Sequence, residues 1–474
     1  MRRAFAVGLA CLLLVPAEGL RAQFGFTDVF KPAEFTARRA KVMERIGNGI
    51  AVIQGSAEYP GFVKFRQNAQ FHYLTGVEVP RAVLVIDGKA HKSTLYLPPK
   101  GRLANSEGPI LIPDDDALRI TGVEQVAFRD SVIPALTVLA SEGRPFYAPF
   151  RSESRLAGAT AQSKSFDAAN LADPLDGQHS REWALVDKLK SLSGGKDVQD
   201  LDLILDALRV IKSPAEIAVM RESARIAQLG IMEAMRSARP GMYEYELAAV
   251  ADYEFRRHDA QGFAYFALVS TGTNAAWPHY HMTSSKLGPS ELVLFDYAPD
   301  YKYYQSDVTR EFPSNGKFTP RQREMYTIYL RLYKAIETSI KTKVAPREII
   351  KEAVVKMDRI MAGFTFTDPK IKEAAERFVN GYRNPTRNSL GHFLGMETHD
   401  VSMPYETLQP GMVFTIEPAL TIPDERVYVR LENVFLITET GYENLSTLAP
   451  EEPEAIERLM REEGIGKQRP KVVP

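Results

Sequence analysis

Two aspartates in the second half of the chain lie where a single β-hairpin would bring them together. Residues 291–296 form an apolar segment that ends in Asp296, and residues 303–312 predict a returning strand that carries Asp307. A turn centred on residues 301–302 would place the two aspartates opposite each other, about 5 Å apart. Carboxylates this close repel each other unless a cation or a proton lies between them. Taken alone, the pair could equally be two unrelated solvent-facing aspartates.

A second predicted hairpin carries two glutamates. The apolar segment 412–420 contains one charged residue, Glu417, and Pro423–Glu425 predicts a turn before the returning strand 427–437. Arg430 and Glu432 share one face of that strand by its period of two, and Glu417 falls near Glu432 across the pair. A carboxylate in so apolar a strand is costly unless it is paired or bound to metal. An ion pair of Arg430 with either glutamate is the alternative.

Histidines are concentrated near these hairpins. Four of the eight histidines lie in two short segments, namely His279 and His281 in one, and His392 and His399 in the other. The chain has a single cysteine, Cys11, so a thiolate metal cluster is excluded and any metal must be held by oxygen and imidazole ligands.

Four carboxylates and one imidazole make an oxygen-rich ligand set. Such a set suits a pair of divalent ions, with Mn²⁺ first and Zn²⁺ or Co²⁺ as alternatives. Two ions roughly 3.5–4 Å apart can share a hydroxide that attacks an amide carbon. The remaining histidines could then position the scissile carbonyl and stabilise the tetrahedral intermediate.

The helices around this constellation predict an internal duplication. Residues 213–216 (SPAE) form a capping box that opens a long amphipathic helix, and residues 319–322 (TPRQ) repeat the pattern about a hundred residues later. A second helix follows each, at 244–257 and 347–361, and strand-like segments come next. Two such units predict a duplicated half-barrel with its site in the central cleft.

Length and composition limit the possible domain organisation of the whole chain. Its 474 residues predict two or three domains, and the net charge of −1 gives no general basic field for nucleic acid. Residues 1–22 have the charged start, short apolar run and small residues of a cleaved signal peptide, and no later apolar run is long enough to span a membrane. Residues 23–205 predict a mixed α/β domain with buried strands near 49–55 and 82–86 and a surface connection at 158–174.

The ordered set Asp296, Asp307, His392, Glu417 and Glu432 resembles the pita-bread metallopeptidases, in their proline-specific branch of Xaa-Pro aminopeptidase (aminopeptidase P) and prolidase. The resemblance is carried by the strings at 211–214 (IKSP), 306–310 (SDVTR), 391–395 (GHFLG) and 415–418 (TIEP), and more weakly by residues 66–76. It implies an α/β (α+β) fold. A creatinase-like mixed α/β domain would span 23–205, followed by a pseudo-twofold pita-bread catalytic domain over 206–474.

The resemblance also assigns roles to the ligand set. Asp296, Asp307 and Glu432 would bind one metal ion, and Asp307, His392, Glu417 and Glu432 the other, so that Asp307 and Glu432 bridge the two. The catalytic residues implied are His279 and His399, which would contact substrate, Glu417, which would handle the proton of the nucleophilic water, and Arg430, which would hold the carboxylates in place.

Two positions depart from the family pattern. Asn388 stands where these peptidases usually have a histidine four residues before the ligand histidine, and Thr398 stands where isoleucine or valine usually precedes the substrate-contacting histidine. Asparagine does not titrate, so proton transfer in the cleft and the preference for proline are the properties that Asn388 puts in question.

The function expected is a dinuclear aminopeptidase in the periplasm or secreted, which removes a residue that precedes proline. The alternative is a prolidase-type Xaa-Pro dipeptidase. A third interpretation is a metal-free binding module or a creatine-type amidinohydrolase, but these relatives lose metal ligands and all five are present here. The expected partners are peptides with proline at the second position and a second copy of the chain, in a homodimer or homotetramer, with neither nucleic acid nor, after signal cleavage, a membrane.

Overall fold

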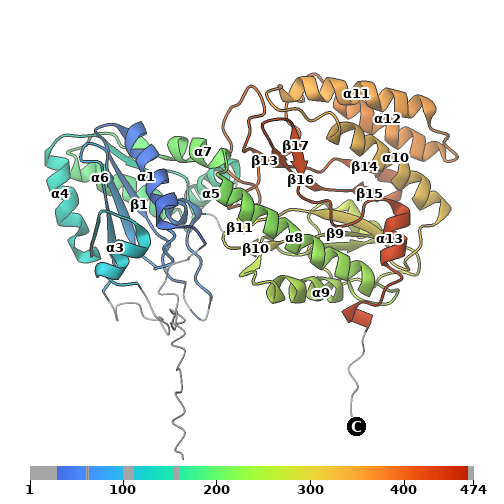
Figure 1. Cartoon of the computed structure of the whole chain (residues 1–474), viewed down its shortest axis with the longest axis horizontal. Helices are drawn as coiled ribbons and strands as arrows, with labels where there is room; N and C mark the ends of the chain where they lie inside the picture. The colour runs from blue at the N-terminus through green and yellow to red at the C-terminus, as the bar shows by residue number, and fades with distance from the viewer. Residues whose placement is uncertain (1–28, 60, 62, 100–110, 154–159, 468–474) are drawn as a thin grey trace, which may run out of the picture.

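A computed structural model describes residues 29–59, 61, 63–99, 111–153 and 160–467 (Figure 1). The predicted signal peptide, residues 1–22, lies outside these residues. Within them, no helix combines the length and the apolar composition needed to cross a membrane.

The N-terminal half is built on a six-stranded mixed sheet. Its strand order is β4-β3-β2-β1-β5-β6. The strands are β1 (Ile50–Gln54), β2 (Val83–Asp87), β3 (Lys92–Leu97), β4 (Gln125–Phe128), β5 (Phe146–Ala148) and β6 (Gln199–Asp200). The two buried strands predicted from sequence are β1 and β2, in antiparallel pairing.

Among the described residues, seven helices belong to this half, and α1 (Pro32–Ile46) lies on one face of the sheet and α4 (Val132–Ser141) and α6 (Arg181–Leu192) on the other. The others are α2 (Ala69–Thr75), α3 (Asp115–Thr121), α5 (Thr160–Ala172) and α7 (Asp202–Val210). Alternate residues of β1 explain the two layers: Ile50 and Val52 pack in a core with α4 and α6, whereas Ala51 and Ile53 pack in the core that contains α1.

The segment predicted as a surface connection contains a helix that the prediction did not include. Residues 160–172 form helix α5, although the described residues of that helix are mostly exposed, as a surface segment would be. Four of its thirteen residues are alanine, the strongest helix former, and that propensity decides the local structure where packing does not.

The helices of the catalytic half agree with the predicted duplication. Both capping boxes are formed, and they open α8 (Pro214–Ser237) and α10 (Pro320–Glu337). The second helices are α9 (Glu244–Arg257) and α11 (Pro346–Gly363). In Figure 1, α8 and α9 lie on one side of the strands, and α10, α11 and α12 (Pro369–Arg383) lie on the other. The prediction did not include α12 or the short α13 (Pro453–Leu459).

The strands between these helix layers form four small sheets. Those that follow α9 are β7 (Gly262–Phe263), β8 (Leu268–Thr271), β9 (Leu292–Asp296), β10 (Pro299–Tyr301), β11 (Tyr304–Gln305) and β12 (Thr309–Pro313). Those that follow α12 are β13 (Val413–Ile416), β14 (Ala419–Ile422), β15 (Val427–Arg430), β16 (Asn433–Ile437) and β17 (Tyr442–Asn444).

The register predicted for the first hairpin is wrong. Asp296 pairs with Thr309, not with Asp307. The turn lies one residue further along than predicted, at Lys302 and Tyr303, which both have left-handed backbone with φ of 52° and 70°. Glycine and asparagine usually signal such a turn, and neither is present here. Asp307 therefore lies in the gap between the β9–β12 and β10–β11 pairings, two residues before Thr309.

The second hairpin has the predicted turn and the predicted register. The turn is a 3₁₀ segment at Pro423–Glu425. Ile416 pairs with Asn433, and Ala419 pairs with Arg430. Glu417 and Glu432 therefore lie opposite each other, at the point where pairing between β13 and β16 stops and pairing between β14 and β15 has not begun. In both hairpins, carboxylates occupy a break in the strand pairing.

Candidate metal centre

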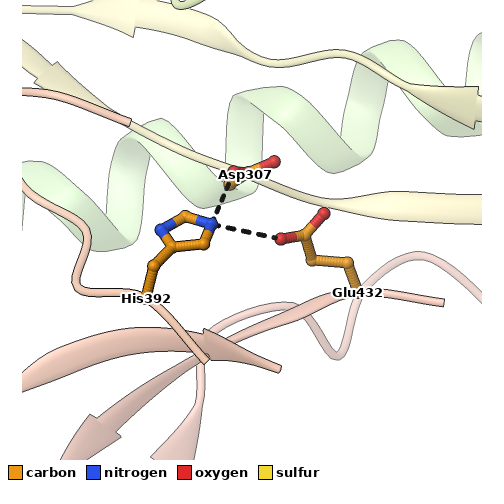
Figure 2. Close-up of side chains that lie close together, drawn as sticks. All are labelled: Asp307, His392 and Glu432. Atoms are coloured by element: carbon orange, nitrogen blue, oxygen red, sulfur yellow. Dashed lines mark ion pairs between the residues drawn. The ribbon is translucent and has the colours of Figure 1, made fainter. Parts of the chain in front are cut away.

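Three predicted ligands converge at the breaks in the two hairpins. One ligand atom each from Asp307, His392 and Glu432 lies within 4.8 Å of the others, and Figure 2 shows the imidazole pointing between the two carboxylates. The distance from His392 Nε2 is 3.5 Å to Asp307 Oδ2 and 3.9 Å to Glu432 Oε1. Glu417 joins them, with its Oε1 3.2 Å from the same nitrogen.

Asp296 is tied to this group by two further side chains. The Tyr265 hydroxyl lies 2.5 Å from Asp296 Oδ1 and 2.7 Å from Asp307 Oδ1, so one phenol spans the two aspartates. Arg430 donates to Asp296 and, at 3.2 Å, to Glu417 Oε2. The structure thus brings together all five predicted ligands and Arg430, and the Arg430–Glu417 ion pair considered from sequence is part of the cluster.

Sequence reasoning missed Tyr265. The residue lies in the run 263–266 (FAYF), just before β8, and nothing in that aromatic run separates the tyrosine from a core residue. Only the tertiary structure brings its hydroxyl to the two aspartates.

Burial and crowding oppose ionisation of two carboxyls in the cluster. Burial raises the pKa of Asp296 to about 7; Arg430 acts in the opposite direction, and the charge of Asp307 adds to the increase. Burial, followed by the charges of Asp307 and Glu417, also holds the pKa of Glu432 well above its ordinary value. In the absence of a cation, the group therefore retains protons at neutral pH.

Glu417 shows the opposite behaviour. Burial alone would raise its pKa, but the neighbouring His392 imidazole, 3.2 Å away, and the charge of Arg430 lower it to about 2. Glu417 is also about 30% exposed, whereas Glu432 is buried. One carboxylate of the cluster is therefore ionised and open to solvent.

The donor atoms fit a divalent cation. His392 Nδ1 lies 3.1 Å from the carbonyl oxygen of Phe393, which places a proton on Nδ1 and leaves the lone pair of Nε2 directed at the carboxylates. Both His392 Nε2 and Glu432 Oε1 are buried without a hydrogen-bond partner. Buried polar atoms are rarely left unpaired, so these two atoms are the positions that a metal ion would satisfy.

His399 lies beside the cluster on a loop that buried charges hold in place. Its ring centre is 4.4 Å from that of His392, edge to face. The next residue, Asp400, is buried and pairs with Arg209 and, at 3.1 Å, with Lys212. Lys212 belongs to the string 211–214, so a motif noted in the sequence anchors the loop of His399.

The remaining predicted residues lie further from the carboxylates. His279 is exposed, in the segment between β8 and β9, and it is near enough to His399 to contribute to its electrostatics. Burial lowers the pKa of His399, and the neighbouring His392 adds to the decrease. Asn388 is exposed four residues before His392, so it is not part of the buried cluster.

Comparisons with known proteins agree with this geometry. The sequence model of metallopeptidase family M24 matches residues 218–439, and that of the aminopeptidase P N-terminal domain matches residues 35–145. The chain is 32% identical to Xaa-Pro aminopeptidase of Escherichia coli over 90% of its own length and 97% of that protein. It belongs to metallopeptidase family M24.

Other relatives of this M24 metallopeptidase are consistent with this assignment. A mitochondrial intermediate cleaving peptidase of Arabidopsis thaliana is 30% identical, with 93% of this chain and 85% of that protein covered. A solved Escherichia coli aminopeptidase P in complex with substrate has a TM-score of 0.72 at 28% identity, covering 91% of this chain and 98% of that one. The predicted α/β fold with an aminopeptidase P-type N-terminal domain and a pita-bread catalytic domain is confirmed, and the chain is a hydrolase.

For this metallopeptidase we expect Tyr265→Phe to weaken metal binding by about 10–100-fold, the usual effect of losing a partner behind a metal ligand. The phenol is the donor that Asp296 and Asp307 share, and without it the two carboxylates lose a fixed orientation. Isothermal titration calorimetry with Mn²⁺ measures the change in metal affinity. Tyr253→Phe, at an exposed tyrosine of α9, is the control, and equal affinity in the two variants would contradict the role given to Tyr265.

Proposed function

We propose that this protein is an exported, dinuclear Xaa-Pro aminopeptidase. The observation that carries the proposal is the match, over nearly the whole of both chains, to a protein named Xaa-Pro aminopeptidase, combined with a buried carboxylate–imidazole cluster of fitting chemistry. The prolidase alternative is not favoured, because the relatives that match over most of this chain include several named Xaa-Pro aminopeptidases.

In this proposal, two divalent ions, with Mn²⁺ preferred, occupy the cluster. Asp296, Asp307 and Glu432 would hold one ion, and Asp307, His392, Glu417 and Glu432 would hold the other. Bound there, the ions supply Lewis acidity and make a water acidic enough to act as a nucleophile at neutral pH. A zinc-substituted Escherichia coli aminopeptidase P is among the similar structures, so zinc is the first alternative to test.

In this proposal, the side chains around the ions have the remaining catalytic roles. Glu417 is ionised and partly exposed, so it can take the proton of the attacking water and pass it to the leaving nitrogen. Arg430 neutralises Asp296 and Glu417 and keeps both in place. His399, whose ring contacts that of His392, and the exposed His279 are the histidines that could donate to the carbonyl oxygen of the scissile bond.

Mass analysis of peptide products tests the activity. The metal-loaded protein is incubated with Ala-Pro-Ala, with Ala-Pro and with Ala-Ala-Ala. An Xaa-Pro aminopeptidase releases alanine and Pro-Ala from the first peptide and leaves the last intact. Turnover confined to the dipeptide would support a prolidase instead, and release of free alanine from Ala-Ala-Ala at an equal rate would contradict specificity for proline.

Export is the second part of the proposal, and it rests on residues 1–22. We expect the full-length chain, produced in a Gram-negative host, to be found in the periplasm or the medium with an N-terminus that follows Ala17 or Ala22. Intact-mass measurement of the fractionated protein checks the cut, and a chain lacking residues 2–22 is the control. Full-length protein retained in the cytoplasm would contradict export.

We also propose a homodimer or a homotetramer. Sedimentation equilibrium of the metal-loaded protein measures its mass directly. A single species of 53 kDa or less would contradict this part of the proposal.

Asn388 is expected to influence the pH dependence of the reaction. A histidine at this position would titrate near pH 6–7 at the edge of the site, whereas asparagine does not. We expect Asn388→His to add a limb to the pH–rate profile between pH 5 and 9, or to change the ratio of rates on matched Ala-Pro and Ala-Ala peptides. Profiles and ratios identical to those of the parent enzyme would show that this exposed position plays no part in proton transfer.

A further inference from the structure

Helix α5 brings a side chain from outside both family matches to the edge of the metal centre. Gln162 lies in the first turn of α5, and its amide nitrogen is 3.1 Å from His399 Nδ1. The matches to the two family models cover residues 35–145 and 218–439, so neither includes α5. The contact joins positions 237 residues apart and is therefore a property of this chain's tertiary structure rather than of either family model.

The residues on either side of His399 in its loop are fixed by other contacts. Buried Asp400 pairs with Arg209 and Lys212, and the Thr398 hydroxyl bonds to the side chain of Gln305. These contacts hold the residues on either side of His399. Among the described residues, the hydrogen bond with Gln162 is the one that reaches the imidazole ring itself.

The direction of this hydrogen bond determines where the ring carries its proton. A side-chain amide nitrogen is a donor only, so the nitrogen that faces it, Nδ1, must be the acceptor. In a neutral imidazole the other nitrogen, Nε2, then carries the hydrogen. A ring in this tautomer can donate from Nε2 to a carbonyl oxygen; the opposite tautomer cannot.

We propose that Gln162 is a positioning residue that holds His399 in the tautomer protonated on Nε2, ready to donate a hydrogen bond to the carbonyl oxygen of a bound peptide. The consequence for catalysis rests on the function proposed above. The tautomer itself does not, because it follows from the contact between the two side chains.

Nitrogen-15 NMR of the imidazole rings in the zinc-loaded protein reads the tautomer directly. Zinc is diamagnetic, so it does not broaden the signals, and comparison with His399→Asn assigns the ring. At pH 8 we expect the His399 signals of the parent protein to be those of the Nε2–H form. Gln162→Glu keeps the size of the side chain but offers only acceptors, so Nδ1 should become protonated and both ring signals should move.

Kinetics on Ala-Pro-Ala then measures the effect on catalysis. Gln162→Met removes the donor at similar size and should lower kcat/KM about tenfold with unchanged metal content, the effect of losing one hydrogen bond. Lys164→Ala, at an exposed residue of the same helix, is the control and should match the parent enzyme. A loss of metal or of folded protein in Gln162→Met would point to a structural role and would overturn the assignment.

The two proposals fail in different ways. If the parent protein cleaves no Xaa-Pro peptide, the proposed function is wrong, and the NMR comparison still decides the role of Gln162. If the parent ring is protonated on Nδ1, or if the His399 signals of Gln162→Glu coincide with those of the parent, the inference is wrong whatever the activity. The same holds if Gln162→Met and Lys164→Ala have equal kcat/KM.

Discussion

Replacing Asp307 with asparagine is expected to abolish peptide hydrolysis and to lower the metal content, while the fold persists. Asp307 lies between the other proposed ligands: its carboxylate is 3.5 Å from the imidazole of His392 and 2.7 Å from the hydroxyl of Tyr265, which also bonds to Asp296. An amide has nearly the same shape but no negative charge, so it could not bridge the two cations of the proposed site. The loss should exceed the roughly 10–100-fold effect of removing a partner behind a ligand.

Elemental analysis, circular dichroism and kcat/KM on Ala-Pro-Ala test this expectation together. Asp176→Asn makes the same chemical change at an exposed aspartate between α5 and α6, and it should retain the metal content and rate of the parent enzyme. A fully active Asp307→Asn enzyme with a full complement of metal would show that Asp307 is not a bridging ligand.

His399→Ala is expected to separate substrate binding from metal binding. The ring lies beside His392, but it is not one of the three residues whose ligand atoms converge, and its Nδ1 faces Gln162. Its removal should keep the metal content and lower kcat/KM by roughly 10²–10³, the loss typical of one donor to a developing oxyanion.

His179→Ala, at an exposed histidine of the N-terminal half, provides the matched control for His399→Ala. Elemental analysis of both variants is essential, because the interpretation depends on where the loss arises. Metal loss in His399→Ala would mean that His399 is a ligand, and a rate within twofold of the parent would mean that it does not contact the reacting carbonyl.

The elements that could be predicted from sequence are those whose signals are local. The capping boxes at Ser213 and Thr319 fix the starts of α8 and α10, because the cap and the third helical residue are close in the chain. The second hairpin was correctly placed because the turn at Pro423–Glu425 contains proline and two acidic residues. In such a hairpin, the turn sets the register of every residue beyond it.

The first hairpin has no such local signal at its turn. Lys302 and Tyr303 adopt left-handed backbone without the residues that usually announce it, so the predicted register was displaced and Asp296 was given the wrong partner. The two aspartates are still neighbours, because Tyr265 joins them and they lie near a break in the pairing. The proximity of these residues was predictable from residue type and order, whereas their geometry required the tertiary structure.

Tyr265 and Gln162 could not have been selected from sequence at all. Each reaches its partner across a distance in the chain that no periodicity or motif records: 31 residues from Tyr265 to Asp296 and 237 from Gln162 to His399. Gln162 also lies in the segment predicted only as a surface connection, so the local sequence gives no reason to consider it.

Helix α7 affects how the protein unfolds and where a protease can cleave it. The helix spans the position, between residues 205 and 206, at which the sequence suggested that one domain ends and the next begins. Asp206 accepts two hydrogen bonds from Arg151 of the N-terminal half, and Arg209, on the same helix, pairs with Glu397 and Asp400 beside the metal centre. A protease needs an extended, exposed segment, and this connection is helical and fixed by buried charges on both sides. Limited proteolysis should therefore spare it, and the two halves should melt in one cooperative transition.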